Sequence, residues 1–296
     1  MNEYKTPLRV SLFGGGTDYP AWYKDHGGMT IGGAINFFVR WQMGISENQC
    51  THDEVEIIQK LKSFLGYSDT YFYYENNAHL FIGKGLGASS ASFSSLIKLL
   101  TKDQFSDEEI IQKVTNFERN YLGKDSGDQD QILVNTPGFR WVEFLNDGLW
   151  KSDVFPLTDD FRQELNDSLF LIDTNVARNF PNITSQSIRH DSGEASIKNI
   201  SDITKEAFKV LSSDNASIEA IGKLLDETWK AKKGINPHIS NESVDQIITM
   251  LKKENIFGAK LLGSGGGGFI LALAPREIMK KISNKWSIPV MDIEFI

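Results

Sequence analysis

The chain has little cysteine, a deficit of basic residues and no long apolar run. Cys50 is the one cysteine among 296 residues, which excludes an intramolecular disulfide and a multi-cysteine metal site and fits a reducing compartment. No stretch approaches the ~18 consecutive apolar residues that span a membrane. Residues 1–5 lead into a charged segment without the apolar core of a signal peptide. We therefore expect a cytoplasmic protein that does not bind membranes.

Acidic residues outnumber basic ones, at 39 Asp and Glu against 31 Lys and Arg, which gives a formal net charge of −8. A basic surface supplies most of the affinity in nonspecific nucleic-acid binding, so this balance argues against a nucleic-acid partner. An anionic substrate would need a local group of basic residues. With 40% hydrophobic and 24% charged residues, the chain can form one large or two ordinary domains with a packed core.

The apolar spacing predicts helices that alternate with short antiparallel strands, a pattern typical of an α+β fold. Strands are expected at residues 7–13, 27–44, 55–58, 71–74, 139–144, 148–155, 169–174, 258–262, 269–274 and 288–296. Helices are expected near 21–23, 61–65, 93–102, 106–122, 199–211, 218–233, 243–253 and 276–284. The aromatic run at 71–74 could instead form one wall of a nucleobase pocket. A polar turn cluster at 156–160 predicts a boundary between domains at 1–160 and 161–296.

The segment Gly83 to Ser92 has three alternating glycines, a run of small residues and then an apolar helix. Glycine allows positive φ and close approach to a ligand, and the free N–H groups at a helix start attract anions. The segment is a candidate phosphate-binding loop, although a glycine-rich turn before a helix is also a common tight connection. No Walker A motif, no His-Arg-Asp kinase signature and no Rossmann Gly-x-Gly-x-x-Gly accompanies it.

The expected strand at 7–13 carries Arg9 and Ser11 on one face and runs into the turn-forming segment Gly14 to Pro20. Two interpretations of Asp18 in that segment stay open. Its carboxylate could cap the helix that follows. Alternatively, side-chain-free glycines could expose it as the floor of a pocket, where it would accept hydrogen bonds from a polyol.

Two further stretches carry carboxylates in positions that need an explanation. The sequence Ser106 to Glu109 is a capping box, which predicts a helix that ends at Gly123. Glu118 lies on the apolar stripe of that helix, so it must be paired with a base, protonated or bound to a cation such as Mg²⁺. The polar cluster Ser126 to Gln131 follows, and beside a phosphate-binding loop it would offer a carboxylate that can take a proton.

Basic residues and a second glycine loop occur in the C-terminal half. Residues 175–191 have the composition of a loop, and Arg178, Arg189 and His190 within it are candidate anion ligands. The glycine loop Gly263 to Gly268 connects two expected strands.

Together these motifs resemble those of the GHMP small-molecule kinases, the family of galactokinase, homoserine kinase, mevalonate kinase and phosphomevalonate kinase. The resemblance covers nearly the whole chain and rests on three separated motifs, at Thr6 to Tyr19, Gly83 to Ser92 and Lys260 to Phe269. Within that family the first and third motifs are most similar to those of D-glycero-D-manno-heptose 7-phosphate kinases. The resemblance implies an N-terminal domain like domain 2 of ribosomal protein S5 and a ferredoxin-like C-terminal domain.

The resemblance also implies an ATP site with Mg²⁺. The phosphates would lie against the glycine loop and the start of its helix, formed by Gly83, Gly85, Leu86, Gly87, Ala88, Ser89 and Ser90. Ser89 and Glu118 would ligate the Mg²⁺, which prefers hard oxygen ligands and keeps several waters. Asp130 would be the general base toward the sugar hydroxyl, and Arg9 would lie beside it and keep it ionised.

For the sugar, the resemblance implies a site formed by Gly15, Gly16, Thr17, Asp18, Arg178, Gly265 and Gly266. A phosphate already present on the substrate would need cations, and Arg178, Arg189, Lys232 and Lys233 are the candidates. Lys84 departs from the small residue usual in relatives, and we expect it to point to solvent rather than to a phosphate.

Three functions stay open at this stage. The first is an ATP-dependent kinase that phosphorylates the anomeric hydroxyl of a heptose 7-phosphate. The second is a kinase of the same family for another sugar, such as galactose or fucose. The third is a sugar-sensing relative without catalysis, against which the presence of Ser89, Glu118, Asp130 and Arg9 argues. A homodimer is compatible with all three.

Overall fold

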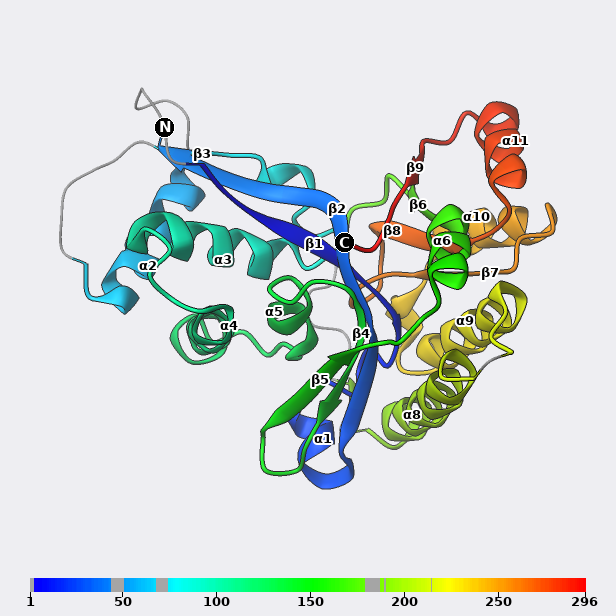
Figure 1. Ribbon diagram of the computed structural model, residues 1–296, viewed down its shortest axis with the longest axis horizontal. Helices are drawn as coiled ribbons and strands as arrows, with labels where there is room; N and C mark the ends of the chain where they lie inside the picture. The colour runs from blue at the N-terminus through cyan, green and yellow to red at the C-terminus, as the bar shows by residue number, and fades with distance from the viewer. Residues whose placement is uncertain (1–2, 44–50, 68–73, 179–186, 189, 214) are drawn as a thin grey trace.

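A computed structural model of the protein describes residues 3–43, 51–67, 74–178, 187–188, 190–213 and 215–296. Within these residues it has two antiparallel sheets with helices packed against both (Figure 1). The expected α+β fold is confirmed.

The first sheet has the strand order β1-β2-β4-β5, with β3 paired to β2. Its strands are β1 (Glu3–Phe13), β2 (Gly28–Met43), β3 (Tyr74–Asn76), β4 (Phe139–Phe144) and β5 (Trp150–Val154). Gly32 lies where β2 pairs with β1, and a Cβ there would come within 2.3 Å of the Val10 carbonyl oxygen. The strand expected at 71–74 meets β3 at Tyr74, and residues 71–73 lie outside the described residues.

Helices α3 and α8 both contact β1 and β2, and Figure 1 shows them on opposite sides of these strands. The helices of this part of the chain are α1 (Pro20–His26), α2 (His52–Leu65), η2 (Ala78–Leu80), α3 (Ala88–Thr101), α4 (Asp107–Asn116), the π-helical turn η3 (Phe117–Tyr121) and α5 (Gln129–Leu133). The capping box expected at Ser106 to Glu109 is present.

The strand expected at 55–58 is wrong, because these residues lie inside α2. Thr51 and Glu54 form a capping box at the start of that helix, and Gly66 ends it in the left-handed conformation. Ile58 and Leu61 form its buried face. The β-branched residues of this stretch resemble a strand, but the capping signals on both sides outweigh them.

The second sheet has the order β7-β8-β6-β9, again antiparallel throughout. Its strands are β6 (Leu169–Asp173), β7 (Gly258–Leu261), β8 (Phe269–Leu273) and β9 (Val290–Asp292). The accompanying helices are α6 (Asp159–Ser168), α8 (Asp191–Leu211), α9 (Ile218–Lys233), η4 (Pro237–Ile239), α10 (Glu242–Lys252) and α11 (Arg276–Trp286). The strands expected at 169–174, 258–262 and 269–274 are confirmed.

Contacts between the two sheets bring the two glycine loops together. The buried ammonium of Lys260 in β7 donates a hydrogen bond to the Leu12 carbonyl of β1 at 2.7 Å. Phe269 N donates to Lys84 O at 3.1 Å, so the start of β8 lies next to the candidate phosphate-binding loop. The C-terminal end returns to the first sheet, where Ile296 N donates to Ala34 O at 3.1 Å.

Among the described residues, no helix is both long and apolar enough to cross a lipid bilayer. The division into domains at 1–160 and 161–296 stays a prediction. Helix α6 begins at Asp159 and runs to Ser168, so it crosses the expected boundary between residues 160 and 161.

Candidate active site

The glycine loop at 83–87 leads into the start of α3. Gly83, Gly85 and Gly87 have left-handed φ values of 79°, 89° and 70°, which other residues adopt only at a cost in energy. A Cβ on Gly85 would lie 2.4 Å from Arg178 Nη2 and 2.8 Å from the carbonyl carbon of Leu262. The loop can therefore lie against the C-terminal glycine loop, and the N–H groups of the first turn of α3 face the same region without helical partners.

Glu118 lies in the π-helical turn η3, where its carboxylate is buried with only 3% of the residue exposed. It accepts hydrogen bonds from Ser89 Oγ at 3.0 Å, Ser90 Oγ at 2.8 Å and Gln131 Nε2 at 2.7 Å. Lys124 Nζ is 3.4 Å from its Oε1. These donors compensate the burial of the charge, and the widened turn that carries it is of a kind often found at functional sites.

The oxygen atoms at Ser89 and Glu118 fit a magnesium site. Ser89 Oγ and Glu118 Oε1 are 3.0 Å apart, and neighbouring ligands of an octahedral Mg²⁺ with bonds of 2.0–2.1 Å lie ~2.9 Å apart. The described parts of the chain contain no cluster of three or more His, Cys, Asp or Glu side chains suited to a metal. A Mg²⁺ that also binds phosphates needs only one or two protein ligands.

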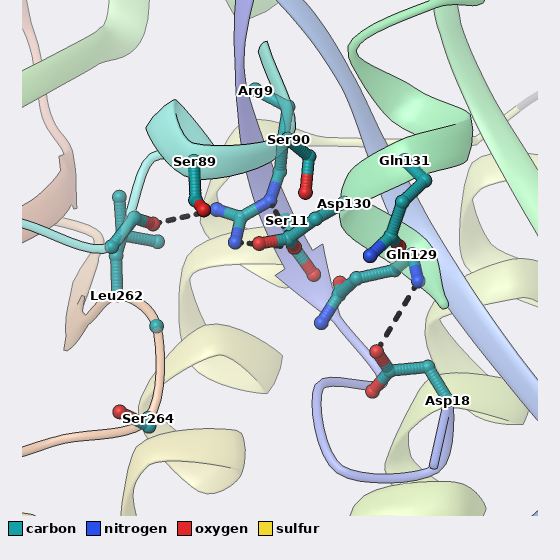
Figure 2. Close-up of polar contacts among 12 residues, drawn as sticks. Arg9, Ser11, Asp18, Ser89, Ser90, Gln129, Asp130, Gln131, Leu262 and Ser264 are labelled. Atoms are coloured by element: carbon teal, nitrogen blue, oxygen red, sulfur yellow. Dashed lines mark hydrogen bonds and ion pairs between the residues drawn. The ribbon is translucent and has the colours of Figure 1, made fainter. Parts of the chain in front are cut away.

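Arg9 and Asp130 form a close ion pair next to the glycine loop at 83–87. Arg9 Nε and Nη2 lie 2.8 and 2.6 Å from the same oxygen, Asp130 Oδ1, and Arg9 Nη1 donates to Gly85 O at 2.6 Å. Figure 2 shows the guanidinium pointing at the carboxylate. Asp130 Oδ2 has no hydrogen-bond partner among the described residues, and 31% of the Asp130 side chain is exposed. One oxygen is thus fixed by Arg9, and the other can accept a proton.

Asp18 is buried under the glycine turn at 14–16. Its Oδ1 accepts a hydrogen bond from Gly16 N at 2.9 Å. Its Oδ2 accepts one from Gln129 N at 3.3 Å, as Figure 2 shows. Burial raises the pKa of this carboxyl to about 6, against the lowering effect of these backbone hydrogen bonds. Helix α1 begins without a side-chain cap, so Asp18 does not cap that helix. It instead connects the first motif to the polar cluster Ser126 to Gln131.

Two basic side chains approach from the C-terminal half. Arg178 donates to Gly267 O at 3.1 Å and to Leu262 O at 2.9 Å, and Lys232 donates to Leu261 O at 3.1 Å and also to Gly263 O. Burial and the neighbouring Arg9 lower the pKa of Arg178 to about 10. Burial, and next the positive charge of Lys260, lower the pKa of Lys232. No carboxylate in the described residues lies within ion-pair distance of either side chain.

All of these groups line one cavity of about 310 Å³. The glycine loop with Ser89, Ser90 and Glu118 forms one part of it, and Arg9 and Asp130 form another. Gly15, Gly16 and Asp18 border it, as do Arg178, Lys232, Gly263 and Ser264 from the C-terminal half. The three motifs therefore meet at one space.

Some expected site residues lie elsewhere. Thr17 is fully buried with its hydroxyl bonded to backbone carbonyls, and Leu86 is buried with its carbonyl bonded to the Arg9 N–H. Gly265 and Gly266 contact Ile239, and neither lines the cavity. Their roles as ligand contacts stay predictions.

The other candidate cations have different surroundings. Lys84 does not point freely to solvent as expected: its ammonium pairs with Asp173 at 2.6 Å. Lys233 pairs with Asp245 on the exposed side of α9. His190 is the residue before α8, and Arg189 lies outside the described residues.

Sequence reasoning missed Lys124 and Gln131. Gln131 holds Glu118, and Lys124 contacts both Glu118 and Ser89. The glutamine could have been found, because it follows directly on Asp130 in the polar cluster. The position of Lys124 depends on how the chain leaves the π-helical turn, which has no clear sequence signal.

Comparison with known proteins finds relatives in the family that the three motifs resemble. Residues 206–290 match the family described as "GHMP kinases C terminal". The chain is 23% identical to the D-glycero-alpha-D-manno-heptose 7-phosphate kinase of Campylobacter jejuni, over 90% of this chain and 87% of that protein. It is 26% identical to the bifunctional fucokinase/GDP-fucose pyrophosphorylase of Arabidopsis thaliana, over 92% of this chain but only 30% of that protein. The crystal structure of a D-glycero-D-manno-heptose 1-phosphate kinase from Bacteroides thetaiotaomicron superposes with a TM-score of 0.75 at 20% identity, over 99% of this chain and 96% of that one.

The chain therefore has the fold of the GHMP kinases, and the resemblance expected from the three motifs is confirmed. Its relatives support an ATP-dependent small-molecule kinase. Proteins named as heptose phosphate kinases are among its most similar relatives in both sequence and structure.

Proposed function

We propose that the protein transfers the γ-phosphoryl group of ATP to the anomeric hydroxyl of D-glycero-D-manno-heptose 7-phosphate. The product would be the 1,7-bisphosphate, an intermediate toward nucleotide-activated heptose. The observation that carries this proposal is the meeting of a phosphate loop, an Arg9–Asp130 pair and two basic side chains without carboxylate partners at one cavity.

In the reaction, Asp130 Oδ2 accepts the proton of the sugar hydroxyl. The hydroxyl oxygen forms a bond to the γ-phosphorus as the bond from that phosphorus to the β–γ bridging oxygen breaks, and ADP leaves with the electron pair. Arg9 holds Asp130 through Oδ1 and is 5% exposed, so its charge acts in a poorly solvated site, where it stabilises the transferring group more strongly than in water. General base catalysis of this kind contributes roughly 10²–10⁴-fold.

Ser89 and Glu118 would hold the Mg²⁺ that accompanies ATP. When bound, the metal supplies neutralisation of charge on the phosphates. The first-turn N–H groups of α3 and the loop glycines would bind the phosphate oxygens directly. Gln131 and Ser90 orient the Glu118 carboxylate by binding its other oxygen.

The substrate's own phosphate accounts for Arg178 and Lys232. Each places a basic group at the cavity with only backbone or hydroxyl acceptors, and Lys232 is buried. An anion would stabilise this arrangement. Asp18 and the glycines at 15 and 16 would bind the sugar hydroxyls. Relatives named for heptose 7-phosphate and heptose 1-phosphate support a phosphorylated sugar as the acceptor.

A coupled assay of ADP release across a panel of acceptors tests the proposal. The panel is D-glycero-D-manno-heptose 7-phosphate, the corresponding 1-phosphate, galactose, fucose and mevalonate. We expect release with the heptose 7-phosphate and at most slow release with the neutral sugars. Release with galactose or fucose alone would favour the second function, and no acceptor-dependent release would favour a sugar-sensing protein.

A further inference from the structure

Lys124 fills the space between the phosphate loop and the π-helical turn. Its ammonium lies 2.9 Å from Ser89 Oγ and 3.4 Å from Glu118 Oε1, and 4.9 Å from the centre of the Phe93 ring. Its backbone N–H donates to Glu118 O at 2.9 Å, which fixes the residue at the end of the turn. The side chain is 41% exposed, so its long stem can move while the backbone stays in place.

The contacts of Lys124 are the ones that a divalent ion would need. Ser89 Oγ donates its proton to Glu118 and accepts a hydrogen bond from Lys124, so the ammonium occupies one of the two lone pairs through which this hydroxyl could bind a metal. Lys124 is also the one basic side chain in the described residues within ion-pair distance of Glu118. A bound Mg²⁺ would remove both the acceptor and the need for a counter-charge.

A displaced ammonium has a place to go within the same cavity. Lys124 lines it together with Gly87, Ala88 and Ser89, at the N-terminal end of α3. Phosphate oxygens bound there would offer a lysine several strong acceptors within the reach of its flexible stem.

We infer that Lys124 and the divalent cation are alternative occupants of the Ser89–Glu118 pair, and that Lys124 binds a phosphate oxygen of the nucleotide once the metal has replaced it. This inference rests on the proposed kinase function. It makes Lys124 a counter-ion that keeps the buried carboxylate paired in the free protein and a phosphate ligand in the loaded one.

The first test measures binding of Mn²⁺ without nucleotide by electron paramagnetic resonance, in the parent and in Lys124→Met. Removal of the competing cation should tighten Mn²⁺ binding by about three- to tenfold. The control is Lys113→Met, because Lys113 also lies over a phenylalanine ring, at 4.1 Å from the centre of Phe105, but lies on α4 away from the cavity. Its Mn²⁺ affinity should match that of the parent.

The second test measures binding of ATP by calorimetry with Mg²⁺ at a concentration that occupies the Ser89–Glu118 pair in the parent and the variants alike. Lys124→Met should weaken binding by about three- to tenfold, because one charged phosphate contact is lost. Lys124→Arg, which keeps the charge, should restore the affinity for ATP. The expected effects of Lys124→Met on metal and nucleotide thus have opposite signs.

Equal Mn²⁺ affinity in the parent and Lys124→Met, including undetectable binding in both, overturns the inference. Weaker binding of both Mn²⁺ and ATP also overturns it, since that result marks a purely structural residue. Sugar-dependent ADP release in either case would leave the proposed kinase function standing. Conversely, opposite effects on the two ligands without ADP release from any sugar would support the role of Lys124 and reject the proposed reaction.

Discussion

At the scale of single residues, the proposed chemistry depends on the two oxygens of Asp130 having different partners. Arg9 binds Oδ1 through two nitrogens, whereas Oδ2 has no partner among the described residues. An asparagine at this position can still offer its carbonyl oxygen to Arg9, but it has no basic oxygen for the substrate's proton. The substitution therefore separates the base from the structural contact.

Asp130→Asn should lower kcat by about 10²–10⁴-fold with little change in the Kd for ATP. The matched control is Asp125→Asn, since Asp125 is an exposed carboxylate at the edge of the same cavity. Steady-state kinetics with calorimetry of ATP binding checks both. A kcat for Asp130→Asn within threefold of the parent value would remove the base assignment.

Asp18 makes the free energy of unfolding depend on pH. Its pKa is raised from 3.8 to about 6 by burial, so the folded protein holds this proton more tightly than the unfolded chain does. Stability is therefore lost as pH rises through that window, by about 2 kcal/mol between pH 4 and pH 7. Urea unfolding of the parent and of Asp18→Asn at pH 4 and pH 7 checks this. Between these two pH values the free energy of unfolding of the parent should fall by this amount relative to that of the variant. A difference independent of pH would contradict the raised pKa.

At the scale of elements, the phosphate loop offers a matched pair of glycines. Both Gly83 and Gly85 have left-handed φ, but a Cβ on Gly83 meets no atom within 4 Å, whereas one on Gly85 collides with Arg178 and Leu262. Gly83→Ala should cost about 1 kcal/mol of stability from backbone strain alone. Gly85→Ala should cost more and raise KM for ATP, because the loop must move off the C-terminal glycine loop. Equal effects of the two substitutions on unfolding and KM would refute this packing.

The sequence was informative where a motif combines local backbone geometry with chemistry. The glycine loop before α3, the capping box at Ser106 and the Arg9–Asp130 pair were all predictable, the last through family resemblance. The strand expected at 55–58 failed because β-branched residues also occur in α2, where capping at Thr51 decides. The ion pair between Lys84 and Asp173 and the position of Lys124 were not predictable, because they arise from contacts between segments far apart in the chain or from an irregular turn.

At the scale of the whole molecule, basic side chains gather in one region although the net charge is negative. The chain carries a net charge of −8, yet Arg9, Arg178, Lys232 and Lys260 converge from both sheets and their connections on the region around one cavity. This is the local basic site that an anionic substrate requires. We assign part of it to the phosphates of ATP, and Arg178 and Lys232 to the phosphate of the sugar.

The most direct measurement is the ratio of kcat/KM for D-glycero-D-manno-heptose 7-phosphate to that for the unphosphorylated heptose. We expect a ratio of about 100 or more in the parent, from charged hydrogen bonds to the phosphate, and a fall of at least about tenfold in Arg178→Gln. Taking the ratio cancels any effect of the substitution on ATP binding. Arg140→Gln is the control, because Arg140 lies in β4 bonded to Pro137 and Ser152, away from the cavity. Equal kcat/KM for the two sugars in the parent would contradict the claim that the protein acts on a phosphorylated sugar.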